Sequence, residues 1–337
     1  MNFDYNEEQQ VLADSVRRFL QKDYDFEARR KIVASPEGWS AQVWSQLAEM
    51  GLTGLPLSPD YGGFGGGAVD LMGVMEAFGE ALVVEPYLAT LIGAQLVARA
   101  GSAEQKRAIL PAVVEGRMKL AFAHTERKQG EMLGVVGAPV ADKLVVSSGG
   151  GLFLAARADV RMKPYRGMDN MVAADLVFSR DKAERMPGGN EALEETLDFA
   201  TALVCAEAVG AMKFACDTTL EYLKTRKQFG VPIGTFQALQ HRMVDMVISY
   251  EQARSMACLA CSRVDQAVDA AERSRSVSAA KIKIADSARH IGQEAVQLHG
   301  GMGMSEELKL SHSFRRLTVA AQQFGDADHH LERFASL

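Results

Sequence analysis

Hydrophobic residues recur every three or four positions through the first third of the chain, which is the period of one face of an α-helix. The clearest case is EEQQVLADSVRRFLQKD, residues 7–23, whose predicted apolar face comprises Val11, Leu12, Val16, Phe19 and Leu20. A second helix is predicted over residues 41–50, and more helices from Ala68 to about Val114, with breaks near Pro86 and Gly101. The chain is therefore expected to begin with a helical domain.

The pattern changes between about Phe122 and Pro187. Short runs rich in β-branched residues, VVGAPVADKLVVSS, GLFLAA and AADLVFS, lie between glycines and small polar residues there, which is typical of strands. A β-barrel or sandwich core of this length is marginal. Either the β domain is reduced or pieces of it are missing.

From about Asn190 the helical period returns in long segments rich in alanine and methionine. The four predicted helices cover residues 192–230, 236–272, 275–300 and 305–324. Four long antiparallel helices form a bundle. The sequence thus predicts a mostly helical α+β protein with three domains: a helical domain (1–121), a small barrel-like β domain (122–189) and a four-helix bundle (190–337).

The composition is that of a globular protein, with 47% hydrophobic and 24% charged residues among 337. Lysine and arginine total 37 against 43 aspartates and glutamates, a net charge of −6, so nothing attracts a nucleic acid electrostatically. No run of about 20 uncharged apolar residues is present, so no membrane span is predicted. The polar, acidic start differs from a signal peptide, and a cytoplasmic location is expected.

Four cysteines are too few for a disulfide framework in a chain of this length. Cys258 and Cys261 form a C-x-x-C inside a helical run, but a zinc site would need a second pair and a thioredoxin-like site a preceding strand. We interpret both as thiols packed between helices.

The segment GLTGLPLSPDYGGFGGGAVD contains five glycines between positions 62 and 67. A glycine-rich loop can cradle phosphates, but a dinucleotide site requires a strand before the loop, and none is predicted. A structural loop is the favoured interpretation.

Three motifs together carry a resemblance. The first is Arg226-Lys227-Gln228-Phe229-Gly230 with Phe236-Gln237 after it, and the second is Gln297-Leu298-His299-Gly300-Gly301. The third is Tyr61-Gly62-Gly63, with His124-Thr125-Glu126 at the start of the strand region. In this order the chain resembles the acyl-CoA dehydrogenase family over nearly its whole length. Within the family it looks most like small subunits of dicarboxylyl- or steroid-side-chain-CoA dehydrogenases.

The resemblance implies an FAD cofactor and names its contacts. The arginine matching Arg226 meets the FAD of a neighbouring subunit, and a guanidinium fork suits a pyrophosphate. Phe229 and Gln237 match the residues beside the adenosine half. Gln297, Gly300 and Gly301 match positions at the diphosphate or ribose and at the flavin, and Thr125 matches a threonine beside the flavin ring. The resemblance implies oxidoreductase chemistry in lipid metabolism: a carboxylate removes the α-proton of an acyl-CoA while the flavin takes hydride from the β-carbon.

The sequence departs from the family at the base. The usual glutamate precedes a glycine at a fixed distance after His-Gly-Gly, and that position is Phe324, before Gly325. The family's alternative base position falls near Ala200 and Thr201, so Asp198 is only a weak candidate and is more simply a residue of a solvated helix face. Glu306 and Glu307 are interpreted as capping or solvating the last helix.

Some family members pair a base-bearing subunit with a base-less one in an α2β2 tetramer, and Phe324 favours that arrangement. An electron-transfer flavoprotein is then a possible electron acceptor. A homo-oligomer stays open, as do a flavin-free helical assembly protein and another flavin oxidoreductase on the same scaffold. Met212, Met243, Met246 and Met256 give the bundle more apolar surface than it needs, which predicts that the bundle is an oligomer core.

Overall fold

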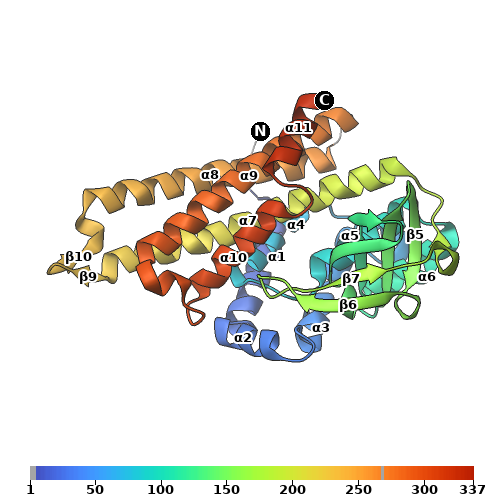
Figure 1. Ribbon diagram of the computed structural model, residues 1–337, viewed down its shortest axis with the longest axis horizontal. Coiled ribbons are helices and arrows are strands. Elements are labelled where there is room, and N and C mark those ends of the chain that lie inside the picture. The colour runs from blue at the N-terminus through green and yellow to red at the C-terminus, as the bar shows by residue number, and fades with distance from the viewer. Residues whose placement is uncertain (1–4, 267–268) are drawn as a thin grey trace. The chain divides into compact units, whose positions relative to one another are not determined.

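A computed structural model describes residues 5–266 and 269–337 (Figure 1). The helices are α1 (Glu7–Asp23), α2 (Phe26–Ala34), α3 (Ala41–Glu49), α4 (Ala68–Ala81), α5 (Tyr87–Ala100), α6 (Ala103–Val114), α7 (Asn190–Thr225), α8 (Gln237–Asp265), α9 (Ala270–His299), α10 (Lys309–Gln322) and α11 (Ala327–Ser336). The strands are β1 (Leu120–Ala123), β2 (Glu126–Lys128), β3 (Glu131–Val136), β4 (Lys143–Ser148), β5 (Gly151–Ala156), β6 (Arg161–Arg166), β7 (Val172–Val177), β8 (Glu184–Arg185), β9 (Lys227–Gln228) and β10 (Val231–Pro232). The mostly helical α+β prediction is confirmed.

The chain divides into two compact units. Unit 1 contains residues 1–28, 68–83 and 201–337, and unit 2 contains residues 29–67 and 84–200. The helix α7 therefore begins in unit 2 and continues through unit 1. This division follows packing in space and not chain order, and the three-domain boundaries inferred from the sequence stay a prediction.

The first helix begins where its sequence provides a cap. The Asn6 side chain accepts the backbone N–H of Gln9, and the Gln9 side chain accepts that of Asn6, so two backbone donors that a helix start leaves open are satisfied. The buried face comprises Ala13, Val16 and Leu20. Val11, expected on that face, is 59% exposed.

Two glycines let α4 and α7 cross with their backbones in contact. A Cβ atom on Gly79 would lie 1.8 Å from the Glu207 carbonyl oxygen, and one on Gly210 would lie 1.8 Å from the Glu76 carbonyl oxygen. Beside this crossing Arg316 of α10 donates to the Glu207 carboxylate, and both side chains are buried. Small residues thus fix how α4 packs on α7 in unit 1.

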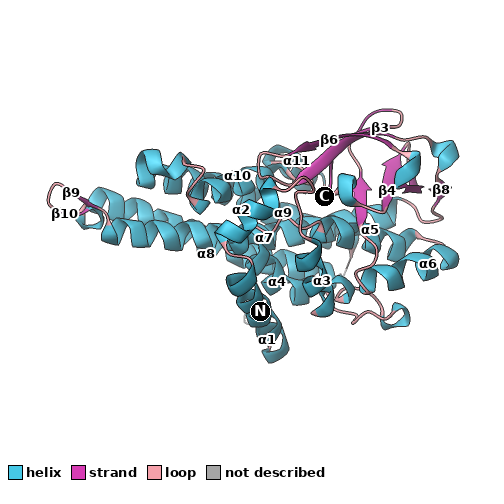
Figure 2. Ribbon diagram, turned by 90° about the horizontal axis from the view of Figure 1, so that it is seen from below, coloured by secondary structure: helices cyan, strands magenta, loops and turns pink. Residues whose placement is uncertain are grey.

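Long helices α7, α8 and α9, with α10, form the bundle, in which α8 and α9 run side by side (Figures 1 and 2). The second predicted bundle helix ends earlier than expected, at Asp265, and α11 was not predicted. Of the four methionines named above, Met212, Met243 and Met246 are buried within this chain and Met256 is half-buried. The argument that these methionines supply surplus surface for an oligomer is therefore wrong; the exposed apolar residues of α8 are Val244, Val247 and Ile248.

The helix α7 is long and apolar enough to cross a membrane by length and composition. In the structure 89% of its most apolar window is buried, which is the behaviour of a core helix. The four cysteines are free thiols, and in α8 Cys261 is buried while Cys258 is half-buried, as expected for packed thiols.

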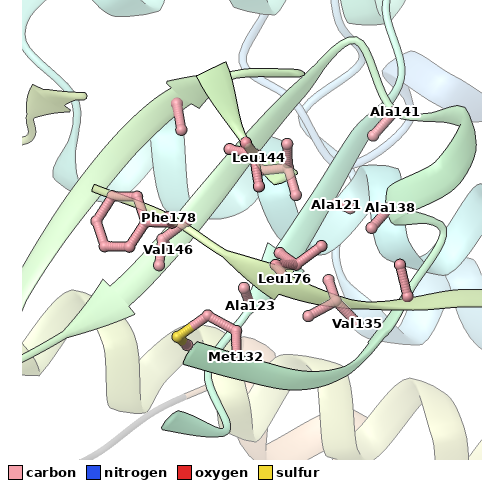
Figure 3. Packing of buried hydrophobic residues seen from close by; sticks show 13 residues of the cluster. Ala121, Ala123, Met132, Val135, Ala138, Ala141, Leu144, Val146, Leu176 and Phe178 are labelled. Carbon is pink, nitrogen blue, oxygen red and sulfur yellow. The ribbon is translucent and has the colours of Figure 1, made fainter. Parts of the chain in front are cut away.

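In unit 2 the strands form two four-stranded sheets, in the orders β1-β4-β5-β8 and β2-β3-β7-β6. Only β1 and β4 pair in parallel; the other pairings in these sheets, within the described residues, are antiparallel. Figure 3 shows the core between the sheets, with Leu144 and Val146 of β4 facing Met132 of β3 and Leu176 of β7. The short β segment thus folds around a hydrophobic core of its own.

The glycine-rich segment at residues 62–67 is a structural loop. Its amide groups donate to main-chain carbonyls, Phe64 to Gly54, Gly65 to Leu57 and Gly66 to Leu55. A Cβ atom on Gly63 would lie 2.2 Å from the Leu57 carbonyl oxygen. The amides are already used and the loop is closed on itself, so it cannot cradle a phosphate.

Candidate functional site

A short hairpin joins α7 to α8 at one end of the bundle (Figures 1 and 2). Strands β9 and β10 pair through Gln228 and Val231, leaving Phe229 and Gly230 as a two-residue turn. Both turn residues have positive φ, +54° and +80°, as a type I′ turn requires. The hairpin folds back onto α7, because a Cβ atom on Gly234 would lie 2.9 Å from the Leu223 carbonyl oxygen.

Phe229 is unfavourable in this turn for two reasons, its backbone conformation and the exposure of its ring. A bulky residue in the left-handed region is strained, by roughly 1–2 kcal/mol, and its side chain is 91% exposed. Its ring has one aromatic neighbour within the described residues, Phe236, whose ring lies edge-on with centroids 6.2 Å apart. An aromatic ring held in solvent on a strained turn indicates a contact with something outside this chain.

Arg226 and Gln237 flank the hairpin and are exposed. Arg226 follows the last residue of α7, and its backbone carbonyl accepts the N–H of Ile233 at 2.8 Å. Among the described residues its guanidinium has no ion-pair partner. Since the Arg226 side chain forms no ion pair among the described residues, it can bind an anion such as a pyrophosphate.

The C-terminal end of α9 supplies the other predicted contacts. Gln297 is exposed in the last turn, its carbonyl accepts the N–H of Gly300, and Gly300 has φ of +63°. A Cβ atom on Gly300 or Gly301 would meet nothing within 4 Å. Open space above two glycines permits a close backbone approach by a ligand.

One contact links this glycine turn to the hairpin. The ring of Tyr222, in the last turn of α7, stacks on the ring of His299 with centroids 4.2 Å apart, and its hydroxyl donates to the His299 carbonyl at 3.4 Å. The structure therefore brings Arg226, Phe229 and Gln237 to the same end of unit 1 as Gln297, Gly300 and Gly301. We call this end the hairpin pole.

Thr125 belongs to unit 2, where it is exposed between β1 and β2. Its carbonyl accepts the N–H of Leu133. The adjacent Glu126 carboxylate accepts hydrogen bonds from the Ser148 hydroxyl and the amides of Gly130 and Gly149. Burial alone would raise the pKa of Glu126, but these hydrogen bonds and Arg180 lower it. The Glu126 carboxylate thus stabilises the turn that follows Thr125-Glu126.

Phe324 lies between α10 and α11, half-buried, with φ of +60°, and Gly325 follows with φ of +107°. The His330 ring donates from Nε2 to the Phe324 carbonyl at 3.1 Å, and Lys281 Nζ donates to the carbonyls of Gly325 and Ala321 at 2.8 and 3.0 Å. Burial lowers the pKa of Lys281 to about 8. The sequence interpretation missed Lys281 and His330, because nothing in their spacing connects them to this turn.

Asp198 lies in the part of α7 that belongs to unit 2 and is fully buried. The expectation of a solvated helix face is therefore wrong. One turn earlier in α7, Glu195 is partly exposed, unlike Asp198, and forms an ion pair with Arg99 at 3.3 Å. Glu306 is exposed beside α10 and pairs with Arg315 at 2.9 Å, as expected of a solvated carboxylate.

The sequence models of two domains match this chain: acyl-CoA dehydrogenase N-terminal domain over residues 6–117, and acyl-CoA dehydrogenase C-terminal domain over residues 188–336. The acyl-CoA dehydrogenase IpdE2 of Mycolicibacterium smegmatis is 30% identical over 329 residues, which are 97% of this chain and 98% of that relative. The chain belongs to the acyl-CoA dehydrogenase family.

Solved structures agree with this assignment. The Tcur3481-Tcur3483 steroid ACAD G363A variant superposes with a TM-score of 0.89 and 26% identity, covering 98% of this chain and 97% of that one. PigA with FAD and proline gives a TM-score of 0.88 and 26% identity, covering 100% and 98%. As an acyl-CoA dehydrogenase family member, the chain carries six of the seven predicted cofactor residues at the hairpin pole, while Thr125 lies in the other unit.

Proposed function

We propose that this chain is the base-less subunit of an acyl-CoA dehydrogenase heterotetramer and that its hairpin pole contacts FAD. One observation carries the proposal: six exposed residues that match the family's FAD contacts lie together, while the position of the catalytic glutamate is Phe324. The chain would then contribute to binding without contributing the base.

The residues of the hairpin pole fit an adenine dinucleotide. The Arg226 guanidinium, which has no ion-pair partner among the residues that the structure describes, suits the diphosphate, and the exposed Phe229 ring offers a flat apolar surface for the adenosine half. Gly300 and Gly301 leave room for backbone amides to approach the ligand, with Gln237 and Gln297 as side-chain hydrogen-bond donors. In unit 2, Thr125 matches the family's threonine beside the flavin ring and is a separate candidate contact. PigA, a relative solved with FAD, supports the choice of cofactor.

Bound FAD would supply the acceptor for the hydride that leaves the β-carbon of the acyl thioester. The residues of this chain must orient that group and exclude water from it. They supply no proton acceptor at position 324, because phenylalanine has no lone pair. A general base contributes about 10²–10⁴-fold to such reactions, so this chain by itself is expected to lack the family's normal rate.

A second subunit with glutamate at the matching position would complete the site. We expect an α2β2 assembly in which that subunit abstracts the α-proton, and an acyl-CoA of steroid-side-chain or dicarboxylyl type as substrate. The similarity to a steroid ACAD supports the steroid type of substrate. An electron-transfer flavoprotein would reoxidise the flavin, and a cytoplasmic location fits this role.

The first test removes the cation. Arg226→Ala should weaken FAD affinity roughly ten- to a hundredfold in fluorescence titrations with FAD, because a charge-assisted hydrogen bond is lost. Arg254→Ala is the matched control: this exposed arginine of α8 lies 3.9 Å from Glu251, away from the hairpin, and should leave the affinity unchanged. Equal affinity of Arg226→Ala and the parent contradicts the proposed contact.

The second test measures the chemistry. A saturated acyl-CoA should bleach the flavin slowly with this chain alone and rapidly when a glutamate-bearing partner is added. Rapid bleaching by the lone chain would mean that another carboxylate acts as base, and Asp198→Asn would then be the first variant to examine. Absence of any flavin would favour a flavin-free assembly protein instead.

A further inference from the structure

The two loops that form the hairpin pole come from different parts of the sequence. The turn at Phe229 and Gly230 extends into solvent beyond a ladder of two residue pairs. The Gly300 turn begins a 3-10 helix, Gly300–Met304, and its N–H donates to the Gln297 carbonyl. For both loops to contact one ligand, something must fix the distance between them.

The last turn of α7 makes that connection through Tyr222. Its backbone carbonyl accepts the N–H of Arg226 at 2.8 Å, so Tyr222 sets where the helix ends and the hairpin begins. Its side chain reaches the other loop, stacking on the His299 ring at 4.2 Å and 23° and donating to the His299 carbonyl. Gly300 follows His299 directly. Tyr222 is therefore hydrogen-bonded to Arg226, where the hairpin begins, and to His299, the residue before the Gly300–Gly301 turn.

His299 is a rigid partner for this contact. Its ring is buried, with 4% of the residue exposed, and Nδ1 bonds the Ala295 carbonyl one turn back in α9 at 2.9 Å. The carbonyl oxygen can only accept, so Nδ1 carries the proton. Burial lowers the pKa of His299, which favours the neutral ring.

We infer that Tyr222, seated on His299, is a positioning residue for the cofactor: it fixes the hairpin that carries Arg226 and Phe229 relative to the Gly300–Gly301 turn. The inference rests on the proposed function, since it assumes that both loops meet FAD. Tyr222 itself touches no ligand in this account. Its contribution is preorganisation, which raises affinity by removing the cost of ordering two loops at binding.

The test uses FAD titrations of the full chain in the assembly in which it purifies. Tyr222→Ala should raise the dissociation constant for FAD at least about tenfold, and Tyr222→Phe, which keeps the stacked ring, should stay within about threefold. His299→Ala should act like Tyr222→Ala, and the double variant should be no worse than either single one. Tyr250→Ala, a half-buried tyrosine of α8, controls for losing a ring from the bundle.

A second readout does not need the ligand. Without FAD, the amides of Ile233 and Gly300 should exchange hydrogen faster in Tyr222→Ala than in the parent and in Tyr250→Ala. If Arg226→Ala weakens FAD binding while Tyr222→Ala does not, the positioning role is wrong and the proposed function stands. If the parent binds no FAD, or Arg226→Ala binds as tightly as the parent, the proposed function fails and this inference with it.

Discussion

Within the described residues, two Phe-Gly pairs have positive φ at both positions, and their surroundings differ. At Phe229-Gly230 the φ angles are +54° and +80°, and at Phe324-Gly325 they are +60° and +107°. The first phenylalanine is 91% exposed on a hairpin. The second is half-buried, and buried side chains of α9 and α11 bond to the carbonyls of its turn.

The comparison shows two ways to maintain a strained turn. Lys281 and His330 hold the Phe324 turn from inside the fold, whereas within the described residues no side chain bonds the backbone of Phe229 or Gly230. A strained turn that the fold does not secure is the better indicator of external binding. The same strain at Phe324 has a sufficient internal explanation.

The largest expected effect concerns pH. Burial, followed by the charge of Lys281, lowers the pKa of His330 to about 4. An unfolded histidine takes up its proton near pH 6.5, so between about 6.5 and 4 the unfolded state binds more protons than the folded state. Stability should therefore fall as pH falls through this window, by up to about 3 kcal/mol.

Urea unfolding of the parent and of His330→Gln at several pH values measures this effect. The glutamine side chain can still donate to the Phe324 carbonyl but does not titrate, so its profile should be flatter between pH 4 and 6.5. Parallel profiles would show that His330 does not couple the Phe324 turn to pH.

The next largest effect should distinguish the Phe324-Gly325 turn, which buried side chains hold, from the Phe229-Gly230 turn. Lys281→Met removes the donor to the Gly325 and Ala321 carbonyls and should lower the free energy of unfolding by about 2 kcal/mol. Lys227→Met is its match in the exposed hairpin and should change stability by less than about 0.5 kcal/mol. Urea unfolding at neutral pH compares the two, and equal effects would remove the distinction between the turns.

The smallest effect should be a gain in stability at Phe229 and none at Phe324. Asparagine tolerates the left-handed region, so Phe229→Asn should stabilise the chain by about 1 kcal/mol while weakening FAD binding. Phe324→Asn relieves similar strain but loses the burial of a half-buried ring, worth about 1 kcal/mol, so no net gain is expected. Thermal and urea unfolding give the stabilities, and a loss of stability in Phe229→Asn would contradict the strain argument.

The sequence alone predicted those features that depend on interactions between residues close together in the chain. The period of apolar residues predicted α1 with its observed bounds and placed the bundle helices, because helix formation depends on residues three and four positions apart. The turn at Phe229-Gly230 was not predicted: the first bundle helix was expected to reach residue 230, but α7 ends at Thr225 and a hairpin follows. The motifs at Arg226 and Gly300 were readable because each is one continuous segment with a fixed spacing.

Tertiary structure decided everything that depends on which segments meet. Burial of Asp198, the methionines inside the bundle and the closed glycine loop at residues 62–67 all result from neighbours far away in the sequence. The same is true of Tyr222 on His299 and of Lys281 and His330 at the Phe324 turn. A sequence specifies which residue types can bond, but whether a group is desolvated, partnered or left open to a ligand depends on the three-dimensional neighbours that packing gives it.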